Sequence, residues 1–163
     1  MFFVEEGYYY PGEFLNLCDK SAIYPIKNGK RFKARRVFEF GKCYCWNDAH
    51  LNDIPINVEG YGNSICVNVY DVKSSYIAWH TDDVNKIKNN LVESYSFAKN
   101  DSDKNEILAV MEFKRKNGKK FSINLRDGMR VTWDLQEHAY EGIQHRVSKT
   151  LVPRINITRR ELK

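Results

Sequence analysis

The sequence contains no long apolar run. No stretch approaches the roughly 18 consecutive apolar residues that a transmembrane helix needs. The opening residues, MFFVEEGYYY, carry two glutamates and no basic residue, unlike a secretory signal. We therefore expect a cytoplasmic protein that makes no contact with a membrane.

Cysteine is also scarce. Cys18, Cys43, Cys45 and Cys66 are too few for a disulfide framework in a chain of 163 residues. A zinc site at Cys43 and Cys45 would need further ligands, and only His50 and Cys66 stand near them in the sequence. We expect reduced thiols, as in intracellular proteins.

Linker-like composition is absent too. The four prolines and nine glycines are dispersed, so residues 1–163 are expected to form a single domain. The net charge of +5 permits a partner that carries phosphate groups but does not require one. Aromatic residues make up 13% of the chain, which suits a binding surface as well as a core.

What the chain does contain is a series of short strand-like segments after one early helix, predicted over residues 11–23. Residues 37–40 and 44–46 suggest a hairpin around Gly41. Further strands are predicted at residues 64–70, 75–80, 91–97, 107–115, 120–125, 129–135, 144–147 and 154–159. This pattern predicts a mainly β fold, either a sandwich, a jelly roll or a barrel.

Two histidines and a carboxylate form the first chemically informative group. His80 and Asp82 would project to the same side of an extended strand. Together with a histidine from a distant strand, they could occupy one face of an octahedral Fe(II) and leave the other positions open. His145 is preferred for that role over His138, because it opens an alternating apolar strand.

A row of polar residues near the end of the chain forms the second group. Alternate residues of an extended strand share one face, and four such residues here are polar: Arg154, Asn156, Thr158 and Arg160. This face would be costly in an apolar core but would suit a pocket for an anion. Asn68 and Tyr70 share a face of another predicted strand and could complete the same pocket.

These motifs resemble those of the AlkB family of Fe(II)- and 2-oxoglutarate-dependent dioxygenases, in family order and with family-like spacing over residues 68–160. The resemblance implies a mainly β (α+β) domain. Its double-stranded β-helix, or jelly-roll, core would span residues 61–163. Residues 1–60 would form a short helix and a lid with a nucleotide-recognition hairpin.

The resemblance also implies roles for individual residues. His80, Asp82 and His145 would bind Fe(II). The residues for 2-oxoglutarate would be Asn68, Tyr70, Arg154, Asn156 and Arg160. Arg160 would also lie beside Asp82 and so would belong, with the three iron ligands, to the catalytic set. The implied reaction consumes O2 and 2-oxoglutarate and removes a methyl group from a base, releasing formaldehyde, succinate and CO2.

On the substrate side, the resemblance implies that Tyr44 and Trp46 contact a flipped base, while Arg35 and Arg36 contact phosphates. Val84 occupies a position that is acidic in many base-repair members, so the neighbouring Asp83 is the remaining acidic candidate. The expected protein is a monomer that binds methylated DNA or RNA in single-stranded form.

Two alternatives stay open. The same fold could hydroxylate a protein, a small molecule or another modified base, and Val84 favours this alternative. A non-catalytic nucleic-acid-binding β-domain, in which the histidines are incidental, would bind neither iron nor 2-oxoglutarate.

Overall fold

The computed structural model describes residues 2–10, 12–44, 46–51, 63–71 and 75–163. The fold is mainly β, with 49% of residues in strands and 15% in helices. Among the described residues, the α-helices are α1 (Gly12–Ser21) and α2 (Leu135–Glu141), and neither has the length and apolar character that crossing a membrane would require. Cys18, Cys43 and Cys66 are free thiols, whereas Cys45 lies outside the described residues.

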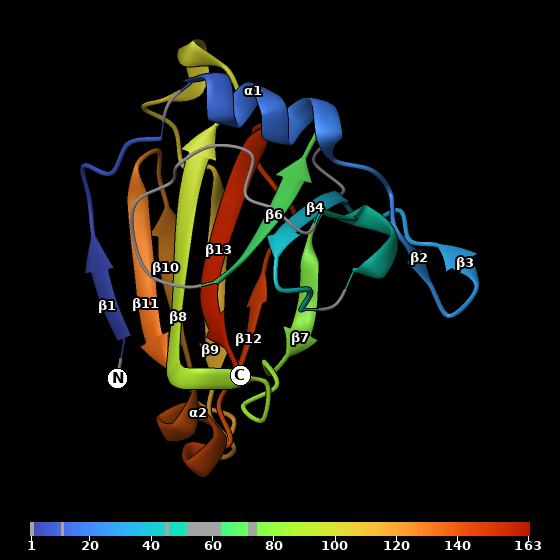
Figure 1. The fold of residues 1–163 in the computed structure, drawn as a ribbon. Helices are drawn as coiled ribbons and strands as arrows, with labels where there is room; N and C mark the ends of the chain where they lie inside the picture. The colour runs from blue at the N-terminus through green and yellow to red at the C-terminus, as the bar shows by residue number, and fades with distance from the viewer. Residues whose placement is uncertain (1, 11, 45, 52–62, 72–74) are drawn as a thin grey trace.

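Most strands belong to two sheets (Figure 1). The large sheet has the order β1-β11-β8-β13-β6-β4-β5, and the small sheet has the order β10-β9-β12-β7. The strands of the large sheet are β1 (Phe2–Glu5), β4 (Arg36–Gly41), β5 (His50–Leu51), β6 (Ser64–Tyr70), β8 (Ile87–Ala98), β11 (Met129–Asp134) and β13 (Arg154–Leu162). Those of the small sheet are β7 (Ile77–His80), β9 (Ala109–Lys114), β10 (Lys120–Leu125) and β12 (Gln144–Val147). Neighbouring strands are antiparallel, except that β4 and β5 are parallel.

Four short elements lie outside these layers or between their strands. The short strands β2 (Ile26–Lys27) and β3 (Lys30–Arg31) pair with each other, and 3-10 helices are formed by η1 (Asn47–Ala49) and η2 (Asp101–Asp103).

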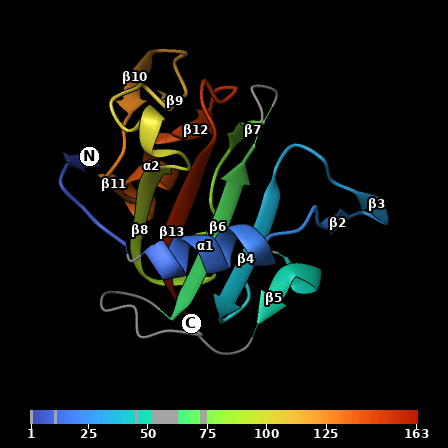
Figure 2. The ribbon, with the colours of Figure 1, turned by 90° about the horizontal axis from the view of Figure 1, so that it is seen from above.

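The outer face of the large sheet is covered by α1, which lies across its strands (Figure 2). Phe14 and Cys18 of the helix are buried there, because positions four apart share one helix face. Ile155 and Ile157 of β13 belong to the same cluster. Since strand side chains alternate, the β13 residues that face the other way, toward the small sheet, are Arg154, Asn156, Thr158 and Arg160.

A second apolar cluster joins the two sheets. Strands β9 and β11 alternate between buried and half-buried residues, as expected for strands with one face in a core. Their buried residues, among them Phe113 and Trp133, pack with Leu135 of α2 and Ile143. The polar face of β13 therefore lies beside an apolar inter-sheet core.

The predicted hairpin around Gly41 is wrong. β4 ends at Gly41 and pairs with β6, and neither Tyr44 nor Trp46 belongs to a strand. The chain turns at Gly41, whose φ is +78°, and a Cβ there would lie 2.1 Å from the carbonyl oxygen of Asn63. Only glycine tolerates both conditions, so the following residues leave the sheet.

The other boundaries agree more closely with the sequence analysis. The strands at 64–70, 120–125 and 144–147 are confirmed to the residue, and the predicted helix is the shorter α1. β8 is longer than the predicted strand at 91–97. The sequence analysis missed β1 and α2.

Candidate metal centre and its cavity

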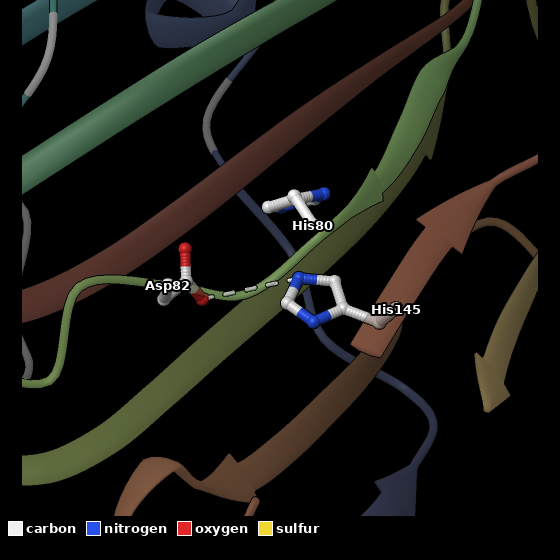
Figure 3. A group of neighbouring side chains, drawn as sticks. All are labelled: His80, Asp82 and His145. Atoms are coloured by element: carbon white, nitrogen blue, oxygen red, sulfur yellow. Dashed lines mark ion pairs between the residues drawn. The ribbon is translucent and has the colours of Figure 1, made fainter. Parts of the chain in front are cut away.

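Three side chains with metal-binding donors meet where β7 ends. His80 is the last residue of β7, Asp82 follows in the loop, and His145 lies in β12. The two imidazole centroids are 4.2 Å apart, and Asp82 Oδ2 lies 3.9 Å from His145 Nε2 (Figure 3). One potential ligand atom from each residue lies within 4.8 Å of the others. The structure thus brings together the three residues selected from the sequence, and His138 is not one of them.

An irregularity in β7 sets the direction of His80. The β7–β12 ladder pairs Ile77 with Val147 and His80 with His145, so β7 uses one more residue than β12 between the two pairs. Ile77 and His80 therefore both face inward, as a bulge permits. The expectation that His80 and Asp82 share one strand face is wrong, because the strand ends at His80 and Asp82 lies in the loop.

The two carboxylate oxygens of Asp82 have different surroundings. Oδ1 accepts hydrogen bonds from Arg160 Nη2 (2.9 Å) and from the Tyr44 hydroxyl (3.3 Å). Oδ2 is buried and has no hydrogen-bond partner among the described residues. Burial raises the pKa of Asp82, but Arg160 and the two histidines outweigh it and lower this pKa to about 2. Asp82 is therefore a carboxylate at neutral pH, with Oδ2 available to a cation.

Both histidines are suited to act as neutral ligands. His80 Nδ1 donates to the backbone carbonyl of Ala78 (2.8 Å), which leaves Nε2 with its lone pair. His145 is buried, and burial lowers its pKa to about 3. Two imidazole nitrogens and one carboxylate oxygen form a donor set that suits Fe(II), so these residues fit a metal ion of this kind.

The polar face of β13 continues from the three donors into the fold. Asn156 of β13 is paired with Asn68 of β6, and their side chains are hydrogen-bonded (Nδ2 of Asn68 to Oδ1 of Asn156, 3.4 Å). Asn156 also donates to Ser94 Oγ (2.7 Å) and accepts from the Thr158 hydroxyl (2.9 Å). These four residues line one cavity of about 590 Å³ together with the three donors and Arg160.

Arg154 lies one position further along the same face. Its side chain is fully buried, and its guanidinium carbon is 3.8 Å from the centroid of the Tyr70 ring. None of its three side-chain nitrogens has a hydrogen-bond partner among the described residues. Burial lowers the pKa of Arg154. A buried guanidinium without a carboxylate is costly unless an anion pairs with it, so Arg154 and Tyr70 fit the carboxylate of a small acid.

The segment after β4 forms another wall of the cavity. Trp46 is buried, and its ring stacks on Phe32 with centroids 5.5 Å apart. Tyr44 accepts the backbone N–H of Asp83 (2.8 Å), and the guanidinium of Arg160 lies 4.1 Å from its ring centroid. Both predicted base-contacting aromatics therefore line the cavity, but the Tyr44 hydroxyl is bound to the loop that carries Asp82.

The two predicted phosphate contacts lie in different places. Arg35 lines the cavity and donates from Nε to Oδ1 of Asn68 (2.6 Å). Arg36 lies elsewhere, with Asp71 2.6 Å from its Nε and Asp19 2.5 Å from its Nη2. Arg36 thus links α1 to the end of β6 through these two ion pairs, and Arg36 does not line the cavity.

Asp83 and Val84 line a second hollow of about 1000 Å³ on the other side of the triad. This hollow reaches Asp82 and His145 from between α2 and the β9–β10 hairpin. His138 of α2 also lines it, and burial lowers the pKa of this histidine.

Several lining residues were not selected from the sequence. Phe32, Tyr76, Ser94 and Trp133 all line the cavity around the triad. Trp133 stands next to the triad, with its ring centroid 5.0 Å from that of His145. Nothing in the sequence indicates that Trp133 lies beside His145, because local sequence does not show which strands pair with β12.

Comparison with known protein families finds none that matches this chain, and comparison with curated proteins finds no match either.

Proposed function

We propose that this chain is an Fe(II)- and 2-oxoglutarate-dependent dioxygenase of the AlkB type that removes methyl groups from nucleic-acid bases. The observation that supports this proposal most is the meeting of His80, Asp82 and His145 within 4.8 Å, in the cavity that is also lined by Asn156, Thr158 and Arg160 of β13. The proposal includes the finer description of the two facing antiparallel sheets as a double-stranded β-helix core.

The metal and 2-oxoglutarate would be held by residues already described. His80 Nε2, His145 Nε2 and Asp82 Oδ2 would be the donors that hold Fe(II). Arg154 pairs with the distal carboxylate of 2-oxoglutarate, assisted by the Tyr70 hydroxyl. Asn68 and Asn156 contact the remainder of the molecule. When bound, iron with 2-oxoglutarate and O2 supplies the oxidation of a C–H bond, with release of succinate and CO2.

The protein's own groups position the reacting parts. Arg160 and Tyr44 hold Oδ1 of Asp82, so that Oδ2 faces the two imidazoles. Trp46 offers a flat apolar wall against which an extruded base can stack. A hydroxylated N-methyl group then leaves as formaldehyde, and its proton passes to the ring nitrogen, which restores the unmodified base.

A second candidate is a hydroxylase of the same fold that acts on a protein, a small molecule or another modified base. Val84 favours it, because an acidic side chain at this position could accept a hydrogen bond from a base amino group and valine cannot. This candidate shares the metal and 2-oxoglutarate residues and differs only in the substrate.

One assay separates these possibilities. The protein is reconstituted with Fe(II) without oxygen and then supplied with O2 and 2-oxoglutarate, with or without a methylated single-stranded oligonucleotide. Succinate and formaldehyde that rise together only with the oligonucleotide support the demethylase. Succinate without formaldehyde supports the second candidate. No succinate under any condition contradicts both and favours a non-catalytic binding domain. Asp82→Ala should abolish succinate formation while the protein remains folded.

A further inference from the structure

The outer face of the small sheet, behind the triad, carries a group of cations around one indole ring. His80, Phe113 and His145 point inward, so the residues next to them in β7, β9 and β12 point outward. These neighbours are Trp79, Lys114 and Arg146. The Trp79 centroid lies 4.5 Å from Lys114 Nζ and 4.6 Å from Arg146 Cζ.

A third cation reaches the same ring from β10. Lys120 Nζ lies 5.8 Å from the Trp79 centroid, and Lys120 is paired directly with Lys114 across the β9–β10 ladder. Like charges directly opposite each other destabilise a sheet. The Trp79 ring offsets part of this repulsion through its negative face, but one ring serves three cations.

Acidic side chains nearby do not neutralise the two lysines. Arg146 is paired with Glu112, and Arg115 in the hairpin is paired with Glu141. Lys114 and Lys120 have no carboxylate partner among the described residues. The same holds for two exposed lysines of the hairpin turn, Lys116 and Lys119. We call the four lysines, together with Trp79 and Arg146, the outer basic face.

The outer basic face continues into the hollow on the α2 side of the triad. Lys114, Arg115 and Lys116 line this hollow on one side, and Asp82 and His145 line it on the other. An anionic chain that follows the hairpin could therefore place one of its units at the triad while its neighbours remain on the lysines.

We propose that the outer basic face binds the phosphates of a single-stranded nucleic acid that flank the base at the triad. The proposal rests on the proposed function for the identity of the anion, and it extends the contact surface from the lid to the opposite side of the small sheet. Regularly spaced phosphates suit the row of lysines along the hairpin, and binding to them is independent of base sequence.

The test uses the metal-free protein and an unmodified fluorescent oligonucleotide of about 15 nucleotides, so that it is independent of turnover. The dissociation constant is measured by fluorescence anisotropy at several salt concentrations. Each phosphate contact on a single strand contributes about 0.7 to the slope of log K against log salt. The double variant Lys114→Gln/Lys120→Gln loses two such contacts, so the slope should become less steep by about 1.4.

A matched control removes the same charge elsewhere. Lys20→Gln/Lys104→Gln changes two exposed lysines outside the outer basic face, one in α1 and one directly after η2, and should leave the slope unchanged. The thermal midpoint of Lys114→Gln/Lys120→Gln should stay equal to or above that of the wild type, because a like-charge pair is removed. A thermal midpoint below that of the wild type would mean that the two lysines stabilise the fold by packing on Trp79, and it would overturn the proposal.

Three other outcomes would also overturn it. The first is an unchanged slope in the hairpin variant, and the second is an equal loss in the control variant. The third is equally tight, equally lysine-dependent binding of poly-glutamate or of vesicles that contain phosphatidylserine. Succinate formation by wild-type protein with Fe(II) is measured separately. If succinate forms while the hairpin variant binds the oligonucleotide like wild type, the proposal for the outer basic face is refuted and the dioxygenase proposal is retained.

Discussion

Replacing Tyr44 with phenylalanine tests whether the segment after β4 orients Asp82 as a metal ligand. The change removes the hydroxyl that donates to Asp82 Oδ1 (3.3 Å) and accepts from the Asp83 backbone (2.8 Å), and it keeps the ring that packs on Arg160. A hydrogen bond to a charged group contributes about 1.5–3 kcal/mol. Because the 3.3 Å contact is long, we use the lower limit, which corresponds to about a tenfold loss of metal affinity. That value agrees with the effect of losing a group that orients a metal ligand.

The assay is a titration of metal-free protein with Co(II), followed by calorimetry and by the visible absorption bands of the bound ion. Tyr44→Phe should weaken binding about tenfold and change the bands, since Arg160 is then the one remaining described donor to Asp82 Oδ1 and the carboxylate is held less firmly. Tyr140→Phe, at a residue of α2 that is 92% exposed, is the matched control and should bind like wild type. Wild-type affinity and spectrum in Tyr44→Phe, with an unchanged thermal midpoint, would refute the assignment.

Three further predictions concern 2-oxoglutarate and stability. Arg154→Gln should weaken 2-oxoglutarate binding at least about 30-fold by calorimetry, because removing one member of a buried charge pair costs about 2–5 kcal/mol. Unchanged affinity would remove Arg154 from the carboxylate role. Arg35→Gln should weaken 2-oxoglutarate binding if its contact with Asn68 belongs to that pocket, and oligonucleotide binding instead if it contacts phosphates. Asp71→Asn should lower the free energy of unfolding by about 1 kcal/mol in urea, as for a partly exposed ion-pair network. The hydrogen bond from Arg36 is the main cause that lowers the pKa of Asp71 to about 2, so the Asp71 contribution is complete above about pH 4 and is lost as pH falls toward 2. A wild-type and Asp71→Asn difference that persists at pH 2 would contradict this.

Much of the sheet structure and the composition of the triad could be predicted from sequence. Alternation of apolar residues identified most strands, because that period reflects the local geometry of a half-buried strand. The meeting of His80 with His145 could be expected only through a pattern spanning distant segments. The register that pairs them depends on β12 lying between β9 and β7, which no local pattern encodes.

The failures have local physical causes. Tyr44 and Trp46 alternate as strand residues do, but the buried carboxylate of Glu39 accepts the Trp46 backbone N–H (3.0 Å) and fixes the segment outside the sheet. The missed helix α2 had a readable signal. Asp134 caps it by accepting the Glu137 N–H (2.9 Å), and Gly142 ends it with φ of +63°. The strand-like run before Asp134 concealed this signal.

The position of β13 has a consequence for how the molecule can be made. This strand, the latest in the described chain, lies between β8 and β6 and pairs with both along almost its whole length. During synthesis, every other strand of the large sheet leaves the ribosome before the strand that joins its two halves. Until then the β1-β11-β8 and β6-β4-β5 groups each expose an unpaired edge. A nascent chain that stops before residue 154 would therefore carry two half-sheets, each with an unpaired edge strand that can pair with another chain. Folding of the domain should be completed only after translation has passed residue 162.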